Sequence, residues 1–347
     1  MAYAGNVTYG GTTIREDLSE LISIMTPADT PLNTLLDSRE VHDTYYDWAM
    51  DALSTPTSVS NQLEGVTPSV NAGAEVVRVV GSLSIVLESV HIANSRRAVK
   101  EAGMSDAYNY QVWKAAVAVM KQMEYNMHWG FSKAVVAADS SARSTVGLGQ
   151  WTLYQTVQGA GNTSYDINDK TFAAGFRNAS FYQATPADLT RTQLHTVLGS
   201  GWDKGMNIDG SLMLCGNDIK RIISEFALVY GAGTSPTARR PQRFKTMDET
   251  IDVFSSDYGD IYINMDRYMT SATAFDYPNA NGTNTTDTQA STFFIIEPDM
   301  YHRTVLRGLS HVPLAVVGDA TEGFCVAEMG LQCDNIQAGI GGTAASA

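Results

Sequence analysis

The stretch TTIREDLSELISIMTPADTPLNTLL, residues 12–36, determines how the rest of the chain is interpreted. Thr13 and Glu16 have the spacing of a capping box, which predicts a helix that begins at Ile14. Apolar residues then recur at helical spacing on one face: Leu18, Leu21, Ile22 and Met25. Pro27 and Pro31 end this helix, because a proline lacks an amide donor and restricts the residue before it. Since so short a helix is unstable alone, it must pack on its own chain or on another copy.

Composition and charge exclude several classes of protein. The 347 residues, 44% of them hydrophobic, suffice for one large domain or two moderate ones. There is no run of about 18 apolar residues and no basic leader followed by an apolar core, so we expect neither a membrane span nor a signal peptide. The net charge of −14 and the pI near 4.8 disfavour a protein that grips nucleic acid, whose phosphates require clustered lysine and arginine.

The segment after the prolines predicts a long excursion of two strands. Residues 41–50 are rich in aromatic and β-branched side chains, and residues 74–92 alternate apolar and small or polar side chains with a break at Gly81. The polar residues 51–73 between them contain little with which to build a core. An isolated two-stranded ribbon is marginally stable, so we expect neighbours to hold it.

The longest helical pattern runs from a cap at Ser105 to about Val136, residues 105–136. Its predicted buried face carries aromatic and methionine side chains: Tyr110, Trp113, Val117, Met120, Met127 and Phe131. A helix of this length is a rod of about 45 Å.

The second half of the chain predicts an α+β arrangement. Thr190 caps a helix to Leu198, and Asn217 caps a second helix that follows a short buried strand. A hairpin and three late strands follow, whereas we expect the tail after Gly339 to be disordered. The expected strands are residues 211–214, 249–255, 260–265, 293–296, 304–309 and 324–333.

The search for chemistry finds no catalytic, cofactor-binding or metal-binding pattern. No Gly-x-Ser-x-Gly elbow, P-loop or zinc-type spacing of histidine and cysteine occurs. Cys215, with His195 upstream, is the nearest approach to a nucleophile and base, but Cys215 ends an apolar strand, which favours a buried thiol. We expect Cys325 and Cys333 to be reduced and buried too.

The order of motifs along nearly the whole chain resembles the major capsid proteins of tailed bacteriophages with the HK97-like fold. The N-terminal motif is REDLSELISIMTPADTPL at residues 15–32, and MKQMEYNM at 120–127 resembles the spine helix of that family. Further matching segments are QLEG at 62–65, SRRA at 95–98, GLGQW at 147–151, GNDIKRIISEF at 216–226, DVFSSDYGDIYINMDRYM at 252–269, EPDMYHRTVLRG at 297–308 and LAVVGDATEGFCVAEMGLQCDN at 314–335.

The resemblance implies an α+β fold with four parts. Residues 1–41 would be an N-terminal arm and residues 42–98 an extended loop. A peripheral domain would comprise residues 99–188 and 296–322, with the spine helix at 105–136. An axial domain would comprise residues 189–295 and 323–347.

The resemblance also implies a function without catalysis. Copies of the chain would form hexamers and pentamers of an icosahedral head around double-stranded DNA, without sequence-specific binding to that DNA. The implied partners are scaffolding, portal and decoration proteins, and the implied location is the virion, assembled in the host cytoplasm. The expected contacts between subunits are Leu18, Leu21, Ile22, Trp48, Glu64, Arg96 and Arg97. Some relatives crosslink a loop lysine to a neighbour, but no lysine lies between Val41 and Val99 here, so we expect no such crosslink.

Three alternatives remain open at this point. A nanocompartment shell of the encapsulin type would share the fold and enclose protein cargo. A hydrolase would use Cys215 with His195. An adhesin or fibre module would display the polar residues 270–290.

Overall fold

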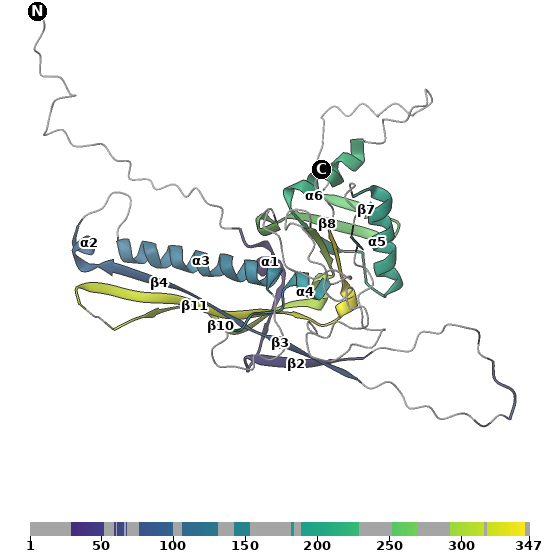
Figure 1. Ribbon diagram of the computed structural model, residues 1–347, viewed down its shortest axis with the longest axis horizontal. Helices are drawn as coiled ribbons and strands as arrows, with labels where there is room; N and C mark the ends of the chain where they lie inside the picture. The colour runs from purple at the N-terminus through teal and green to yellow at the C-terminus, as the bar shows by residue number, and fades with distance from the viewer. Residues whose placement is uncertain are drawn as a thin grey trace, which may run out of the picture.

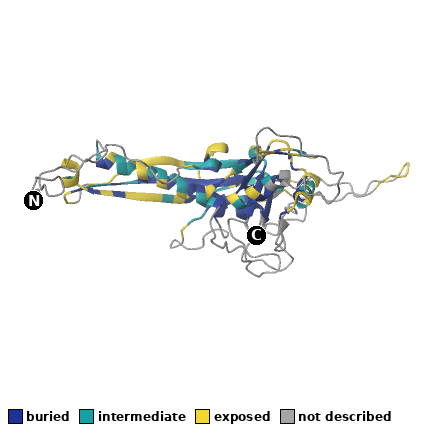
Figure 2. Ribbon diagram, turned by 90° about the horizontal axis from the view of Figure 1, so that it is seen from above, coloured by how far each residue is buried: buried dark blue, intermediate teal, exposed yellow. Residues whose placement is uncertain are grey.

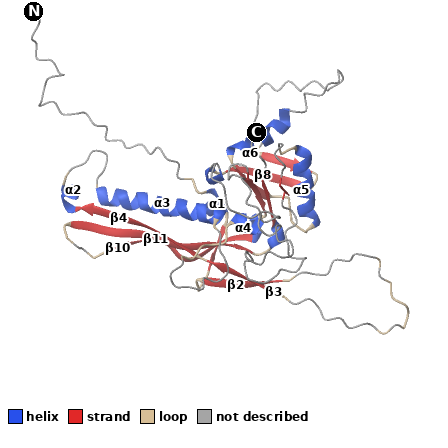
Figure 3. Ribbon diagram, viewed as in Figure 1, coloured by secondary structure: helices blue, strands red, loops and turns tan. Residues whose placement is uncertain are grey.

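The computed structural model describes residues 29–51, 59, 61–65, 67, 76–99, 106–130, 142–152, 182–183, 189–228, 252–269, 292–315 and 318–343. The helix expected from Ile14 lies outside these residues and stays a prediction. The described part is an α+β structure with three sheets, as the sequence predicted (Figure 3).

The longest sheet has four strands in the order β1-β10-β11-β4. They are β1 (Asp37–Glu40), β10 (Tyr301–Pro313), β11 (Ala320–Cys333) and β4 (Ser84–Ala93). β11 is antiparallel to both of its neighbours, and β1 runs parallel to β10. Helix α3 (Ala107–Trp129) lies along one face of this sheet over β4 and β11 (Figure 1). The helix buries the apolar side chains of that face, because an amphipathic helix and a half-apolar sheet need each other.

Helix α3 is shorter than predicted, and the face that it buries differs from the predicted one. It begins after Asp106, whose carboxylate accepts the amide of Tyr108, and it ends at Trp129. A side chain at Gly130 would collide with the carbonyl oxygens of Asn126 and Thr145, so only glycine fits this close approach. The fully buried positions include Val119, Met123 and Met127. Of the predicted stripe, Met127 is confirmed, whereas Trp113 is 46% exposed.

The second sheet has six strands in the order β5-β12-β9-β6-β8-β7. They are β5 (Tyr182–Gln183), β12 (Gly339–Thr343), β9 (Thr292–Ile296), β6 (Ser211–Cys215), β8 (Gly259–Met265) and β7 (Val253–Ser256). The predicted short buried strand and hairpin are confirmed, although residues 249–251 of the hairpin lie outside the described residues. The three late strands are confirmed as β9 of this sheet and as β10 and β11 of the four-stranded sheet. Helices α5 (Arg191–Asp203) and α6 (Asn217–Leu228) contribute to the core on one face. Thr190 caps α5 through a complete capping box with Gln193.

The expectation of a disordered tail after Gly339 is wrong for residues 340–343, and residues 344–347 lie outside the described part of the chain. β12 pairs antiparallel with β9 and parallel with β5, and Ile340 is fully buried. Gly342 lies against the ring of Phe293, and Gly339 lies against the Tyr301 hydroxyl, where a Cβ would collide. The glycines that suggested disorder instead allow the strand to pack against large aromatic rings.

The third sheet is a ribbon of two antiparallel strands, β2 (Tyr45–Met50) and β3 (Val77–Ser82). The expected break at Gly81 is wrong, because Gly81 lies within β3 and pairs with Tyr46. The strand pairing changes at Leu83, because β3 before it pairs with β2 and β4 after it joins the four-stranded sheet. The boundaries predicted for the four parts of the chain stay predictions.

A central core joins the sheets at one end of α3. Leu32, Met127, Trp151, Phe294 and Tyr301 are among its fully buried members. Viewed from above, buried segments gather toward the middle of the molecule (Figure 2). Several short elements lie near this core: α1 (Pro31–Leu35), α4 (Leu148–Thr152) and the 3-10 helices η6 (Arg267–Met269), η8 (Pro298–Met300) and η9 (Ile336–Ala338). The short helix α2 (Asn94–Ala98) lies at the opposite end of α3 (Figure 1).

Candidate assembly surfaces and a buried charged junction

The predicted subunit contacts lie in different environments. Glu64 is exposed in the loop beyond the ribbon, beside Gly65 with a φ of 82°. Trp48, on β2, is half-buried and packs on Trp151 with ring centroids 5.9 Å apart, so its ring supports this copy's own core. Leu18, Leu21 and Ile22 lie outside the described residues.

Arg96 and Arg97 lie on the short helix α2, at the far end of β4. Arg97 donates to Asp106 at 3.1 Å and to Thr321 at 3.3 Å, so it closes the N-terminal end of α3 onto β11. Arg96 contributes to an open groove of about 410 Å³, which we call the β4 groove. Its other lining residues come from β4 and α3: Glu88, Ser89, Val90, His91, Ile92, Gln111, Lys114, Ala115 and Ala118. β4 is the outer strand of its sheet, so this groove exposes a strand edge.

The other end of α3 carries a buried carboxylate that holds the start of the described chain. The Glu124 carboxylate accepts the backbone N–H of Leu32 at 2.6 Å and that of Asn33 at 2.8 Å. These are the first free amides of α1, because Pro31 has none. An anion at this position satisfies donors that no residue of α1 itself accepts. Arg303 of β10 adds two bonds from Nη1 to Asn33, at 2.6 and 2.8 Å.

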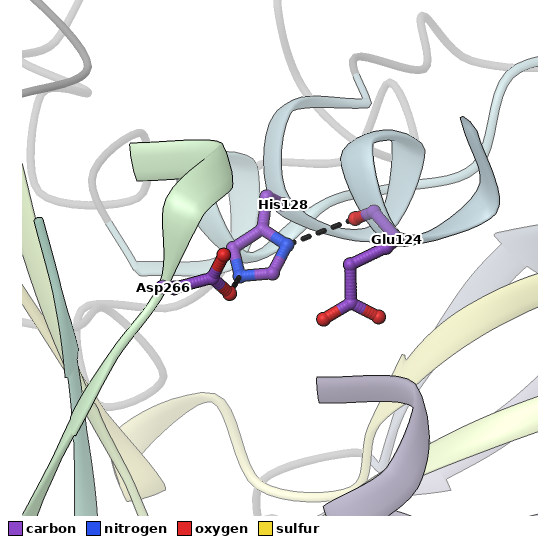
Figure 4. A group of neighbouring side chains, drawn as sticks. All are labelled: Glu124, His128 and Asp266. Atoms are coloured by element: carbon purple, nitrogen blue, oxygen red, sulfur yellow. Dashed lines mark hydrogen bonds and ion pairs between the residues drawn. The ribbon is translucent and has the colours of Figure 1, made fainter. Parts of the chain in front are cut away.

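His128 lies one helical turn after Glu124 and faces the six-stranded sheet (Figure 4). Its Nδ1 lies 2.8 Å from the carbonyl oxygen of Glu124, and its Nε2 lies 2.8 Å from Oδ2 of Asp266. Both neighbours are acceptors, so this environment favours the imidazolium, in which both ring nitrogens carry hydrogens and Nε2 forms a close ion pair with Asp266. Glu124, His128 and Asp266 are all buried, and we call them the buried junction.

The buried junction shifts the pKa values of its three members in different directions. Burial alone would lower the pKa of His128, but the charge and hydrogen bond of Asp266, together with Glu124, raise that pKa to about 9. Burial opposes ionisation of Asp266 as well, but His128 and the Tyr268 amide lower its pKa. Burial raises the pKa of Glu124, against the opposing effects of His128 and the two α1 amides.

The three junction residues do not fit a resident metal ion, although one ligand atom from each lies within 4.8 Å of the others. Two atoms that bind one zinc ion tetrahedrally, each about 2.1 Å from it, lie about 3.4 Å apart. Nε2 of His128 and Oδ2 of Asp266 are closer than that, at 2.8 Å. Both Glu124 oxygens already accept amides. The arrangement is therefore an ion-pair cluster. Glu124 and His128 share a helix face, a signal present in the sequence, but no spacing pattern indicated Asp266.

Comparison with known protein families shows to which family this chain belongs. A sequence model of the family described as the SU10 major capsid protein matches residues 3–344. The chain belongs to this family. It is therefore a major capsid protein of a tailed phage and a component of the virion. A comparison with curated proteins found no match.

Solved capsid structures share the fold of this major capsid protein. The capsid of cyanophage A-1(L) is similar with a TM-score of 0.65 and 10% identity, over 96% of this chain and 98% of that one. The capsid of cyanophage P-SCSP1u has a TM-score of 0.55 and 13% identity, over 98% and 97% of the two chains. The SrpI encapsulin of Synechococcus elongatus has a TM-score of 0.53 and 10% identity, over 95% and 91%.

The major capsid protein shows no accessible nucleophile at Cys215. Burial raises the pKa of this thiol to about 12, so almost none of it is thiolate at neutral pH. The ring of His195 packs against the ring of Phe254, with the two ring centroids 5.6 Å apart. The hydrolase alternative therefore loses the group on which it depended. No helix of the described residues is both long and apolar enough to cross a bilayer.

Proposed function

We propose that copies of this chain form hexameric and pentameric capsomers, which close into an icosahedral head around double-stranded DNA. The observation that carries this proposal is the β2–β3 ribbon with its loop. Val59 and Leu63 in that loop are 90% and 82% exposed, and such large apolar side chains favour burial against another surface. A two-stranded ribbon gains the stability it lacks when neighbours cover it.

In phage capsid proteins with the HK97-like fold, the extended loop of one subunit lies across its neighbour. We propose that the β4 groove is the surface that receives this loop. The loop, residues 51–76, contains three acidic residues and no lysine or arginine: Asp51, Glu64 and Glu75. Lys114 and Arg96 line the groove with one acidic residue, Glu88, so the charge of its lining is positive on balance. Opposite charges on loop and groove favour this pairing and set its register.

The remaining partners follow from the same proposal. The net charge of −14 suits an inner wall past which DNA slides during packaging, because few basic groups are available to hold its phosphates. Scaffolding, portal and decoration proteins would complete the particle, and assembly would take place in the host cytoplasm. The contacts expected at Leu18, Leu21, Ile22, Trp48, Glu64, Arg96 and Arg97 remain part of this proposal.

Electron microscopy of the purified protein tests the proposal directly. We expect closed shells, or rings of five and six subunits, and the ribbon loop of each subunit in density over its neighbour. A monodisperse monomer under all conditions would overturn it, and elongated particles would favour the fibre alternative.

A nanocompartment shell is the second candidate, because the SrpI encapsulin shares the fold over most of both chains. The contents of native particles separate the two. We expect nuclease-protected double-stranded DNA of defined length. Particles that hold a single cargo protein and no DNA would favour the encapsulin-type function.

A further inference from the structure

The start of the described chain is held by side chains from two other elements. We call residues 30–36 the arm root, since the proposed arm precedes and includes it. Leu32 and Leu36 of the root are buried in the central core, with 0% and 4% exposure. The amides of Leu32 and Asn33 both donate to Glu124, whose carboxylate points toward α1 (Figure 4). The direction in which the chain enters the body is therefore set at Glu124.

A continuous set of short contacts connects this point to the six-stranded sheet. The amide of Asp266 donates to the carbonyl oxygen of Cys215 at 2.9 Å, which fixes Asp266 to the end of β6. Its carboxylate reaches His128 through Oδ2 at 2.8 Å and accepts the amide of Tyr268 through Oδ1 at 2.8 Å. The Tyr268 ring stacks on His128, with centroids 6.4 Å apart. His128 then contacts the backbone of Glu124.

We propose that Glu124, His128 and Asp266 act as one positioning element. This element couples the orientation of the arm root to the way in which the six-stranded sheet packs against α3. This proposal rests on the proposed function, in which the arm reaches a neighbouring copy. Within an assembling shell, the junction would determine which neighbour the arm meets. The buried route from Asp266 to the arm root passes through His128 and Glu124. The neighbouring Arg267 also pairs with Asp29, but that pair lies at the surface.

The physical basis of the coupling is the charge on Glu124. A carboxylate accepts both amides of the arm root, whereas a protonated carboxyl has one oxygen that carries a hydrogen and accepts poorly. The His128 imidazolium lowers the pKa of Glu124, and Asp266 raises the pKa of that imidazole. The charge of Asp266 alone raises the pKa of Glu124, so Asp266 favours the ionised carboxylate only by way of His128. The other charged groups nearby act elsewhere: Arg303 binds Asn33, and the Asp29–Arg267 pair is solvent-exposed.

Hydrogen exchange of the assembled protein, followed by mass spectrometry in the peptide of residues 29–36, tests the coupling. In Asp266→Asn we expect exchange of the Leu32 and Asn33 amides to be about tenfold faster than in the wild type. The control is Asp252→Asn, which removes an acid that directly precedes β7 of the same sheet and pairs with Lys220 of α6. We expect no change in that peptide for the control.

A second variant keeps the test decisive if Asp266→Asn folds poorly. Glu124→Gln removes the charge at the arm root itself, and because coupling is reciprocal we expect faster exchange of the Tyr268 amide as well. A change confined to residues 29–36 in Glu124→Gln, or no change there in Asp266→Asn, would overturn the coupling. Faster exchange at both places with normal particle assembly would support the coupling and overturn the role of the arm in the shell.

Discussion

Charged residues inside the core explain why the C-terminal end of α3 packs against its neighbours in one specific arrangement. Glu124 and His128 occupy a helix face on which periodicity predicts apolar side chains. Each is buried because another element supplies its partner, the amides of α1 for one and Asp266 for the other. Burying such groups without partners would cost several kcal/mol, about 3–5 when one member of a buried pair is removed. The junction therefore penalises any packing in which α1, α3 and the six-stranded sheet do not meet together.

The His128–Asp266 pair predicts a loss of stability on the alkaline side. Because the folded state raises the pKa of His128 from 6.5 to about 9, its contribution is complete below pH 6.5 and is lost as the pH rises through 9. Asp266 has a lowered pKa, so its own contribution is lost only in acid, as the pH falls through its folded value. The alkaline loss is on the order of 3 kcal/mol at most.

Urea unfolding of the wild type and of Asp266→Asn at several pH values between 6 and 10 measures this loss. We expect the wild-type free energy of unfolding to fall more steeply with pH than that of the variant, which lacks the negative charge that raises the pKa of His128. Since the other groups titrate in both proteins, the difference between the two curves isolates the pair. Parallel curves would show that His128 is not charged in the folded protein.

At the scale of elements, the sequence predicts best where the signals are local. The cap at Thr190, the buried strand β6 and the β7–β8 hairpin carry their own capping and alternation patterns, and each lies where it was expected. The buried face of α3 was not predictable in the same way, because sheet, arm root and junction cover different sectors of the helix. Strand β12 escaped prediction because the contacts that order its glycines come from rings elsewhere in the chain.

The capping box of α5 gives a prediction for one element. Thr190→Ala removes the hydroxyl that accepts the Gln193 amide, so we expect the free energy of unfolding to fall by about 1 kcal/mol. The control is Thr196→Ala on the same helix, because its hydroxyl only donates back to the Thr192 carbonyl on the exposed face. We expect that change to lie within about 0.5 kcal/mol of zero. Equal effects of the two substitutions in urea unfolding would contradict a specific cap.

At the scale of the whole molecule, the body and the arm separate at the arm root. The family resemblance places the boundary of the arm at residue 41, and that boundary stays a prediction. Within residues 29–41, Leu32 and Leu36 belong to the central core and β1 pairs with β10. The arm root therefore serves the folding of the body. What precedes residue 29 is the part that the proposed function assigns to other copies.

Two truncations distinguish these roles. Deletion of residues 1–28 leaves the arm root in place, so we expect an unchanged urea midpoint and a large loss of closed particles by electron microscopy. Deletion of residues 1–36 also removes two buried leucines and the donors to Glu124. Loss of a buried leucine side chain alone costs about 2–5 kcal/mol, so we expect this longer truncation to destabilise or unfold the body. Normal shells from the shorter deletion would contradict assembly through the arm. A body as stable without residues 29–36 as with them would contradict the division at the arm root, because the core and the buried junction would then tolerate the loss of partners that the structure shows in direct contact.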